Sequence, residues 1–361
     1  MWVAVVIVKS AMLTTMSKVL VGMSGGVDSS ASAVFLLKAG YEVAGVTMKL
    51  WESDEVGCHQ NTVADAKAVA DKLGIPHYTV DFTKQFKENV TDNFVESYLL
   101  GHTPNPCVNC NQYLKFGAML KYAEEIGADY IATGHYAKVE KVGDRYLLKR
   151  CGDQSKDQTY FLYTLTQHQL SKVIFPLCDI TKSETREVAK ELGLSVADKK
   201  DSQEICFIPD DDYVRYITDL KGPQKKGDFI LKDGTVVGQH QGIINYTIGQ
   251  RKGLGIALNR PVYVTDIDAV NNTVTLADNQ DLFGTTLYAE KMNYIPFDAP
   301  KEPFFCTGKI RYRTTDYPCT VYPDGDNAKI VFDTPQRAIT KGQSVVLYDG
   351  DIVIGGGIIN G

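Results

Sequence analysis

The chain lacks the features that mark several common protein classes. The apolar stretch in MWVAVVIVKS is too short to span a bilayer, and it has neither the basic region nor the small-residue cleavage site of a signal peptide. Positive charge is in deficit, because 38 Lys and Arg face 44 Asp and Glu for a net charge of -6. No overall positive field attracts nucleic acid, so any RNA site must be a local basic patch.

Cysteines are few for the length of the chain. Eight are spread over 361 residues, without the dense spacing of a small disulfide-linked domain. We therefore expect reduced thiols, a cytoplasmic protein and no membrane partner. A chain of this length exceeds the size at which one hydrophobic core stops growing, so two or three domains are expected.

From Lys18 to about Gly193, apolar strand patterns alternate with helical patterns. This alternation predicts an α/β domain with a parallel, doubly wound sheet, whose ligands bind at the carboxyl ends of the strands. The expected strands are 18–23, 41–48, 77–81 and 129–133, and the expected helices are 29–39, 62–73, 83–100 and 113–126.

Beyond residue 220 the helical patterns disappear. Short alternating stretches separated by turn residues predict a small β domain and then a β-barrel. These stretches are 228–232, 262–266, 273–276, 309–312, 328–332 and 344–348. We expect an N-terminal extension over 1–16, the α/β domain over 17–211, the small β domain over 212–283 and the barrel over 284–361.

The segment VGMSGGVDSS, Val21 to Ser30, lies between an expected strand and an expected helix. A strand that ends in a glycine loop and opens into a helix directs backbone N–H groups and the helix dipole at one point, which favours an anion. Gly25 and Gly26 allow close approach because neither has a Cβ. Asp28 adds a carboxylate suited to Mg²⁺ beside phosphate oxygens. The loop predicts a nucleotide phosphate site, with a plain strand-to-helix turn as the alternative.

Two common nucleotide motifs are missing from this loop. It has no lysine at the spacing of GxxxxGK[ST], and its glycines do not follow GxGxxG. What remains resembles the SGGxDS loop of the PP-loop ATP pyrophosphatases, which split ATP into AMP and pyrophosphate.

A second cluster, TPNPCVNCN, spans Thr103 to Asn111. Its two prolines stiffen the approach to a helix N-terminus, where a thiolate is stabilised. Half of a zinc site has the same CxxC spacing, but no second CxxC or paired His completes it. Cys206 lies in the apolar run Ile-Cys-Phe-Ile, which alone indicates a buried strand cysteine.

Taken together with ATGHY at 132–136 and KDQTYFL at 156–162, these motifs resemble the bacterial tRNA-specific 2-thiouridylase family. The resemblance runs from about Lys18 to the C-terminus with the motifs in order. It implies that ATP adenylates the 2-carbonyl oxygen of the wobble uridine, position 34, and that sulfur then displaces AMP while pyrophosphate is released. It also implies ATP and Mg²⁺ as cofactors, tRNA of the Lys, Glu and Gln type as partner, and a sulfur-relay protein or cysteine desulfurase as sulfur source.

The resemblance also implies residue roles. Cys206 carries a persulfide, and Cys110 is the nucleophile that releases the sulfur and leaves a disulfide. The target base meets Asn105, Pro106 and Cys107. The residues implied to bind ATP are Gly22, Met23, Ser24, Gly25, Gly26, Val27, Asp28, Ser29, Met48 and Gly134. Those implied to contact tRNA are His135, Lys156, Asp157, Gln158, Arg311, Tyr312 and Gln343.

Several alternatives stay open at this stage. His135 suits a core hydrogen bond as well as RNA, and Lys309, Arg311 and Arg313 suit a solvated strand edge. Cys107, Cys110 and Cys206 together would suit an iron–sulfur cluster with an open iron position. A non-catalytic RNA-binding barrel with a degenerate nucleotide domain would have little reason to retain the intact SGGVDS loop and both candidate cysteines. An adenylating PP-loop ligase of the amidotransferase or argininosuccinate type would leave the TPNPCVNCN and DSQEICF segments unexplained.

Overall fold

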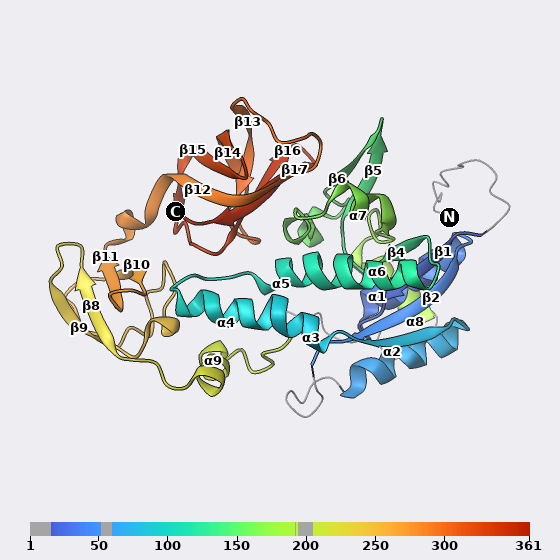
Figure 1. Ribbon diagram of the computed structural model, residues 1–361, viewed down its shortest axis with the longest axis horizontal. Coiled ribbons are helices and arrows are strands. Elements are labelled where there is room, and N and C mark those ends of the chain that lie inside the picture. The colour runs from blue at the N-terminus through green and yellow to red at the C-terminus, as the bar shows by residue number, and fades with distance from the viewer. Residues whose placement is uncertain (1–15, 52–59, 192, 194–204) are drawn as a thin grey trace.

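The computed structural model describes residues 16–51, 60–191, 193 and 205–361, and within them the strands form three sheets. Figure 1 shows the first sheet at one end of the molecule, the smallest at the other, and the C-terminal barrel beside the long helices between them. The expected N-terminal extension lies almost entirely outside the described residues. Within those residues, no helix combines the length and apolar character needed to cross a membrane.

The first sheet is parallel and has five strands in the order β3-β2-β1-β4-β7. They are β1 (Lys18–Gly22), β2 (Glu42–Lys49), β3 (His77–Asp81), β4 (Tyr130–Ala132) and β7 (Val173–Ile174). The order places β1 at the centre, so the loop that follows it opens at the middle of the carboxyl edge. The predicted fold class is confirmed.

Helices cover both faces of this sheet because successive side chains of a strand point to opposite sides. Val19 packs in a core cluster with residues of α1 (Val27–Lys38), α2 (Gln60–Leu73) and α8 (Lys182–Glu191). Leu20, the next residue of β1, packs in the larger cluster that includes the long helices. Both side chains are almost completely buried.

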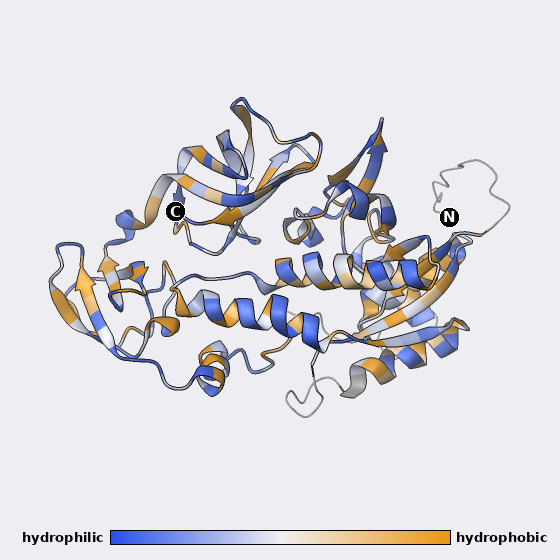
Figure 2. Ribbon diagram, in the orientation of Figure 1, coloured by the Kyte–Doolittle hydropathy of each residue, from blue (hydrophilic) through white to orange (hydrophobic). Residues whose placement is uncertain are grey.

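Two long helical segments form the middle of the molecule and contain π-helical turns (Figure 1). The first has α3 (Thr83–Phe86), η1 (Lys87–Thr91) and α4 (Asp92–Leu99), as expected for 83–100. Figure 2 shows hydrophilic and hydrophobic residues alternating along it, in the manner of an amphipathic helix.

The second helical segment starts earlier than the sequence pattern suggested. It begins with α5 (Pro106–Asn109), continues as the π-helix η2 (Cys110–Ala118) and ends with α6 (Met119–Glu125). Pro106 occupies the first helical position, where its missing N–H costs no hydrogen bond. Both cysteines of the CxxC motif are therefore inside the helix.

The second sheet has four strands in the order β10-β11-β8-β9 and follows the short helix α9 (Tyr213–Lys221). Its strands are β8 (Gly227–Leu231), β9 (Val236–His240), β10 (Tyr263–Asp268) and β11 (Thr273–Ala277).

The third sheet closes on itself through the pairing of β12 with β17, which makes a six-stranded barrel. Its strands are β12 (Phe283–Tyr294), β13 (Phe304–Lys309), β14 (Tyr317–Asp324), β15 (Asn327–Arg337), β16 (Ser344–Asp349) and β17 (Ile352–Ile359). The remaining short elements are η3 (Gln154–Lys156), η4 (Thr159–Phe161), α7 (Gln167–Lys172), η5 (Ile243–Asn245) and η6 (Asn279–Leu282).

A hairpin from the first half of the chain extends the barrel sheet. It consists of β5 (Lys138–Val142) and β6 (Arg145–Lys149), and Lys149 pairs with Ile352 of β17. The sequence analysis did not identify this hairpin. It joins the α/β domain to the barrel by backbone pairing.

The prediction of a strand over 309–312 was wrong. β13 ends at Lys309, and the N–H and hydroxyl of Thr314 both donate to the carbonyl oxygen of Arg311, which closes a turn. Lys309, Arg311 and Arg313 therefore do not lie along one strand face.

Candidate functional site

The loop between β1 and α1 has the geometry of an anion site. Gly25 has a left-handed φ of 63°, and a Cβ there would come within 2.9 Å of the Thr62 carbonyl oxygen. Ser29 closes the loop by accepting from the Ser24 N–H at 3.2 Å and donating to the Gly26 carbonyl oxygen at 3.1 Å. Gly26 is the N-cap and offers no side chain to the first-turn N–H groups of α1, which suits them to bind phosphate.

The loop after β4 packs directly on this site. A Cβ on Gly134 would lie 2.8 Å from the Ser29 nitrogen and 2.9 Å from the Asp28 Cβ, so only glycine fits. Met48 lies near the end of the neighbouring strand β2 and is half-buried against the core. The implied ATP residues on three adjacent strands thus meet at one sheet edge.

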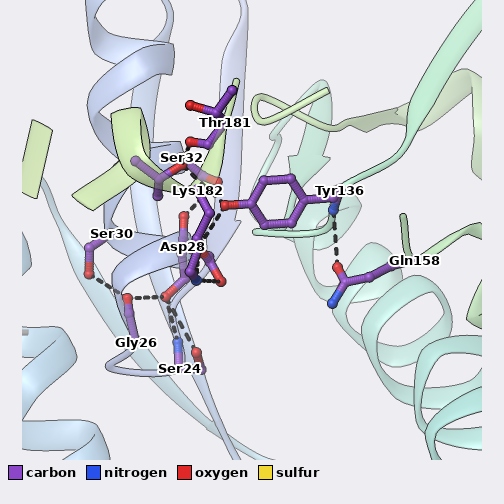
Figure 3. Close-up of polar contacts among 11 residues, drawn as sticks. Ser24, Gly26, Asp28, Ser30, Ser32, Tyr136, Gln158, Thr181 and Lys182 are labelled. Carbon is purple, nitrogen blue, oxygen red and sulfur yellow. Dashed lines mark hydrogen bonds and ion pairs between the residues drawn. The ribbon is translucent and has the colours of Figure 1, made fainter. Parts of the chain in front are cut away.

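Asp28 is held by a cation that the sequence analysis missed. Its two carboxylate oxygens each lie 2.7 Å from the Lys182 ammonium, and the Tyr136 hydroxyl donates to Oδ1 at 3.0 Å (Figure 3). Lys182 begins α8, where a positive charge opposes the helix dipole. That unfavourable placement was the one available sequence signal for a functional lysine.

The Asp28–Lys182 pair affects whether Asp28 can bind Mg²⁺. Both Asp28 oxygens are occupied by Lys182, and no three His, Cys, Asp or Glu among the described residues are grouped to hold a metal. The residues as placed do not form a ready Mg²⁺ site.

Tyr136 links the phosphate loop to the KDQTYFL segment. Its hydroxyl contacts Thr185 of α8 at 3.1 Å. Its backbone N–H donates to Gln158 Oε1 at 3.0 Å, as Figure 3 shows. Gln158, implied to contact tRNA, thus has a supporting role in this structure. The neighbouring Asp157 accepts from Thr159 Oγ1 at 2.7 Å, and burial raises the pKa of its carboxyl.

The candidate thiols are coupled in part, because Cys107 acts on the ionisation of Cys110 and both act on that of Cys206. Cys110 is buried at the first position of η2, whereas Cys107 in α5 and Cys206 keep solvent-exposed surface. The surrounding protein nevertheless withdraws enough water to raise the pKa of all three, that of Cys206 to about 12. The nearby thiols of Cys110 and Cys107 raise the pKa of Cys206 further, and the Lys115 ammonium opposes the rise.

The expectation that a helix N-terminus would ease ionisation of Cys110 was wrong. The helix begins at Pro106, one turn earlier, and burial raises the pKa of the Cys110 thiol. The favourable charge comes instead from Lys115, which lowers it.

Cys206 does not lie in a buried strand. It is in a turn closed by a hydrogen bond from the Ile208 N–H to the Ile205 carbonyl oxygen. Phe207 anchors this turn edge-on against Phe86 and Phe94, with ring centroids 5.6 and 5.4 Å apart. The turn is thus fixed to the long helical segment of α3, η1 and α4.

These thiols do not form a metal site as placed. Within the described ranges, no group of three cysteine, histidine or acidic side chains has metal-binding spacing, so neither the zinc nor the iron–sulfur arrangement is preformed. The donor chemistry suits a cluster, but the geometry does not.

The barrel holds the loop implied to meet the target base. Gln343 donates from Nε2 to the Thr103 carbonyl oxygen at 2.8 Å, and the Thr103 N–H donates to the Lys341 carbonyl oxygen. Asn105, at the N-cap of α5, and Pro106 follow directly on this loop.

Some of the other residues implied to contact tRNA lie in segments that pack against one another. Tyr312 packs on Phe161 of the KDQTYFL segment, with ring centroids 4.5 Å apart, and Lys309 lies over the Tyr312 ring. Arg311 donates to the Ala338 carbonyl oxygen at 2.8 Å, and Lys156 is half-buried in η3. Segments 156–162 and 309–312 therefore form one neighbourhood.

His135 is buried among hydrogen-bonding partners. Its Nδ1 lies 2.7 Å from Thr133 Oγ1 and its Nε2 lies 3.4 Å from Lys115 Nζ. Burial, aided by the Lys115 charge, holds the pKa of His135 well below its usual range. His135 follows Gly134, so a single loop touches both the phosphate loop and the lysine beside the thiols.

A nucleotide loop at the carboxyl edge of a parallel sheet, with cysteines on adjoining elements, defines a PP-loop nucleotide enzyme. Family models match three consecutive parts of the chain: the tRNA methyl transferase HUP domain over 17–210, the tRNA methyl transferase PRC-barrel domain over 216–278 and the aminomethyltransferase beta-barrel domain over 284–359.

Curated relatives match over nearly the whole length. The chain is 52% identical to the tRNA-specific 2-thiouridylase MnmA of Clostridioides difficile strain 630, which covers 95% of this chain and 98% of that protein. It is 53% identical to tRNA-specific 2-thiouridylase MnmA 1 of Clostridium botulinum strain Loch Maree, with 95% and 99% covered. The chain belongs to the tRNA-specific 2-thiouridylase family of enzymes.

Among solved structures, the U34-tRNA thiolase NcsA from Methanococcus maripaludis with its 4Fe-4S cluster matches at 21% identity and a TM-score of 0.36. The match covers 58% of this chain and 69% of that one. A similarity of this size is too low to carry over any property of that enzyme.

Proposed function

We propose that this protein replaces the 2-oxygen of the wobble uridine of tRNA, position 34, with sulfur at the expense of ATP. The observation that carries the proposal is the loop after β4. Its Gly134 packs on Ser29 of the phosphate loop, and its His135 bonds Lys115 beside the thiols of Cys110 and Cys206. This contact supports a proposal in which activation by ATP and delivery of sulfur use adjoining sites.

The first step is adenylation. The triphosphate of ATP binds the N–H groups of the loop from Gly22 to Ser29, and the uridine 2-oxygen attacks the α-phosphorus. The bond to the bridging oxygen breaks and pyrophosphate leaves with its electron pair. Lys182 lies against this loop through Asp28 and offsets negative charge on the departing pyrophosphate. Mg²⁺ would be held by the ATP phosphates themselves, because both Asp28 oxygens are paired with Lys182.

The second step transfers sulfur from a persulfide on Cys206. The Cys110 thiolate attacks the Cys206 Sγ, the bond to the outer sulfur breaks, and a Cys110–Cys206 disulfide forms. The outer sulfur keeps the electron pair and attacks C2 of the adenylated uridine, and AMP leaves with the former 2-oxygen. An external reductant must then restore both thiols before the next turnover.

The partners follow from this chemistry. The outer sulfur comes from a sulfur-relay protein or a cysteine desulfurase, and the substrates are tRNAs of the Lys, Glu and Gln type. Such a reaction takes place in the cytoplasm, where tRNA and reductants are present. An iron–sulfur cluster on Cys107, Cys110 and Cys206 would require these thiols to rearrange, because they lack metal-binding spacing here.

Nucleoside mass spectrometry of tRNA tests the proposal. The protein, ATP, Mg²⁺ and a persulfide donor should produce 2-thiouridine, and Cys110→Ser and Cys206→Ser should each abolish it. Cys178→Ser is the matched control, because Cys178 is not one of the three candidate thiols and its Sγ contacts Asp179. Unchanged thiolation in the Cys110 or Cys206 variant would refute the assigned roles. Visible absorption after anaerobic purification, lost in Cys107→Ser, would support the cluster instead.

A further inference from the structure

The π-helix η2 connects Cys110 to a lysine that no motif assigned. Lys115 follows Cys110 by five residues, the spacing at which a π-helix hydrogen-bonds one turn to the next. Such turns are rare and concentrate at functional sites. The Lys115 side chain is half-buried, and its charge acts on Cys107, Cys110 and Cys206 alike.

His135 fixes the position of this ammonium. Burial keeps the imidazole neutral at pH 7, so one ring nitrogen donates and the other accepts. Lys115 only donates, so Nε2 accepts from it across 3.4 Å and Nδ1–H donates to Thr133 Oγ1 across 2.7 Å. Phe116 and Phe175 flank the ring, with centroids 5.8 and 6.1 Å from it.

Lys115 lowers the pKa of each of the three candidate thiols. Among the described residues, the Lys115 ammonium acts on the ionisation of all three thiols, while the thiol of Cys107 acts on Cys110 and both act on Cys206. Burial and the neighbouring thiols oppose ionisation, and the ammonium favours it.

We propose that Lys115, held by His135, is the positioning residue of the sulfur-transfer site and stabilises the thiolate forms of Cys110 and Cys206. Ionisation of the Cys110 thiol gives its proton to solvent water and leaves the thiolate that attacks the Cys206 persulfide. The same ammonium then faces the negative charge that passes to the outer sulfur when the sulfur–sulfur bond breaks. The inference rests on the proposed function for these two steps of sulfur transfer, whereas the effect of Lys115 on ionisation of the thiols does not depend on it.

Alkylation kinetics test the inference without requiring thiolation. The rate of reaction of each cysteine with iodoacetamide is measured from pH 6 to 10 by peptide mass spectrometry, for the wild type, Lys115→Gln and Lys115→Arg. In Lys115→Gln the rates at Cys110 and Cys206 at pH 7.5 should fall about threefold to tenfold, with the pH profile moved upward. Lys115→Arg should restore most of the rate.

Lys138→Gln is the matched control. The charge of Lys138 acts on Cys178 and is absent from the groups acting on the three thiols, so this variant should change alkylation only at Cys178. Circular dichroism verifies the fold of each variant. Unchanged Cys110 and Cys206 profiles in folded Lys115→Gln overturn the inference, as does a fall that Lys115→Arg does not reverse.

Turnover separates this inference from the proposed function. With tRNA and ATP, Lys115→Gln should lower kcat for thiolation while the KM values for ATP and tRNA stay within twofold. If the wild type forms no 2-thiouridine, the proposed function fails. The alkylation profiles still decide whether Lys115 controls the thiols.

Discussion

Gln343 of the barrel donates a hydrogen bond from Nε2 to the carbonyl oxygen of Thr103, 2.8 Å away, in the loop that leads to α5. The two residues lie 240 positions apart in the sequence. The barrel therefore sets the position of the loop that precedes Cys107 and Cys110.

This contact predicts a defect in turnover when it is removed. Gln343→Ala should lower kcat for thiolation about fivefold, because one neutral hydrogen bond contributes about 1 kcal/mol. The affinity for tRNA, measured by filter binding, should change less than twofold. Gln280→Ala, at an exposed residue of η6, is the control and should behave as wild type. Weaker tRNA binding at an unchanged kcat would assign Gln343 to RNA contact instead.

Gly134→Ala should damage ATP binding and stability together. Its Cβ would lie 2.8 Å from the Ser29 backbone nitrogen, so the loop or α1 must shift. We expect the KM for ATP to rise at least tenfold and the free energy of unfolding in urea to fall by about 1–3 kcal/mol. Gly152→Ala is the matched control, because its Cβ would meet the nearest atom at an ordinary 3.6 Å. Equal effects of the two substitutions would contradict the packing argument.

The Asp28–Lys182 pair gives a third prediction. Lys182→Met should leave the Asp28 carboxylate without its cation, and the rate of AMP formation from ATP should fall at least tenfold, because the charge beside the phosphates is lost. Lys67→Met removes the cation of an exposed pair with Asp71 on α2 and should leave that rate unchanged. AMP formation at the wild-type rate in Lys182→Met would show that the lysine has only a structural role.

His135 gives a prediction about pH. Burial depresses its pKa in the folded state below that of the unfolded chain, so the unfolded state binds more protons below pH 6.5. The neutral imidazole therefore favours folding above about pH 6.5, and this contribution declines as the pH falls. Between pH 7.5 and 5.5 the wild type should lose about 1 kcal/mol more of its free energy of unfolding than His135→Gln does.

Urea unfolding at both pH values checks this expectation. His168→Gln, at an exposed histidine of α7, is the control and should retain the wild-type loss. A His135→Gln variant with the same pH dependence as the wild type would show that His135 is not held neutral by its surroundings.

The sequence patterns predicted β1, β2, β3 and β4 of the parallel sheet, because local patterns mark these strands, but they missed β7, which has only two residues. They also located the glycine loop between β1 and α1, since glycines between a strand and a helix have a clear physical meaning. The β5–β6 hairpin was not identified, and its pairing with β17 could not be predicted because β17 lies near the other end of the chain. Local periodicity carries no information about such a pairing.

The electrostatic details of the site were out of reach for a related reason. Lys182 pairs with Asp28, which lies 154 positions away in the sequence. Lys115 contacts His135 and acts on Cys206 only because the fold brings these distant residues together. The expected ease of ionisation of Cys110 considered the helix N-terminus but not burial, which raises the pKa of this thiol. The electrostatic environment of each group depends on which side chains the fold brings next to it, and the sequence pattern does not show this.

Isotope transfer tests the central claim most directly. An anticodon stem–loop RNA with ¹⁸O at the 2-oxygen of the wobble uridine is incubated with the protein, ATP, Mg²⁺ and a persulfide donor, and the AMP formed is analysed by mass spectrometry. The account predicts one ¹⁸O atom in AMP for each 2-thiouridine produced, because that oxygen attacks the α-phosphorus and leaves with it. AMP without ¹⁸O, alongside full thiolation, would contradict the account.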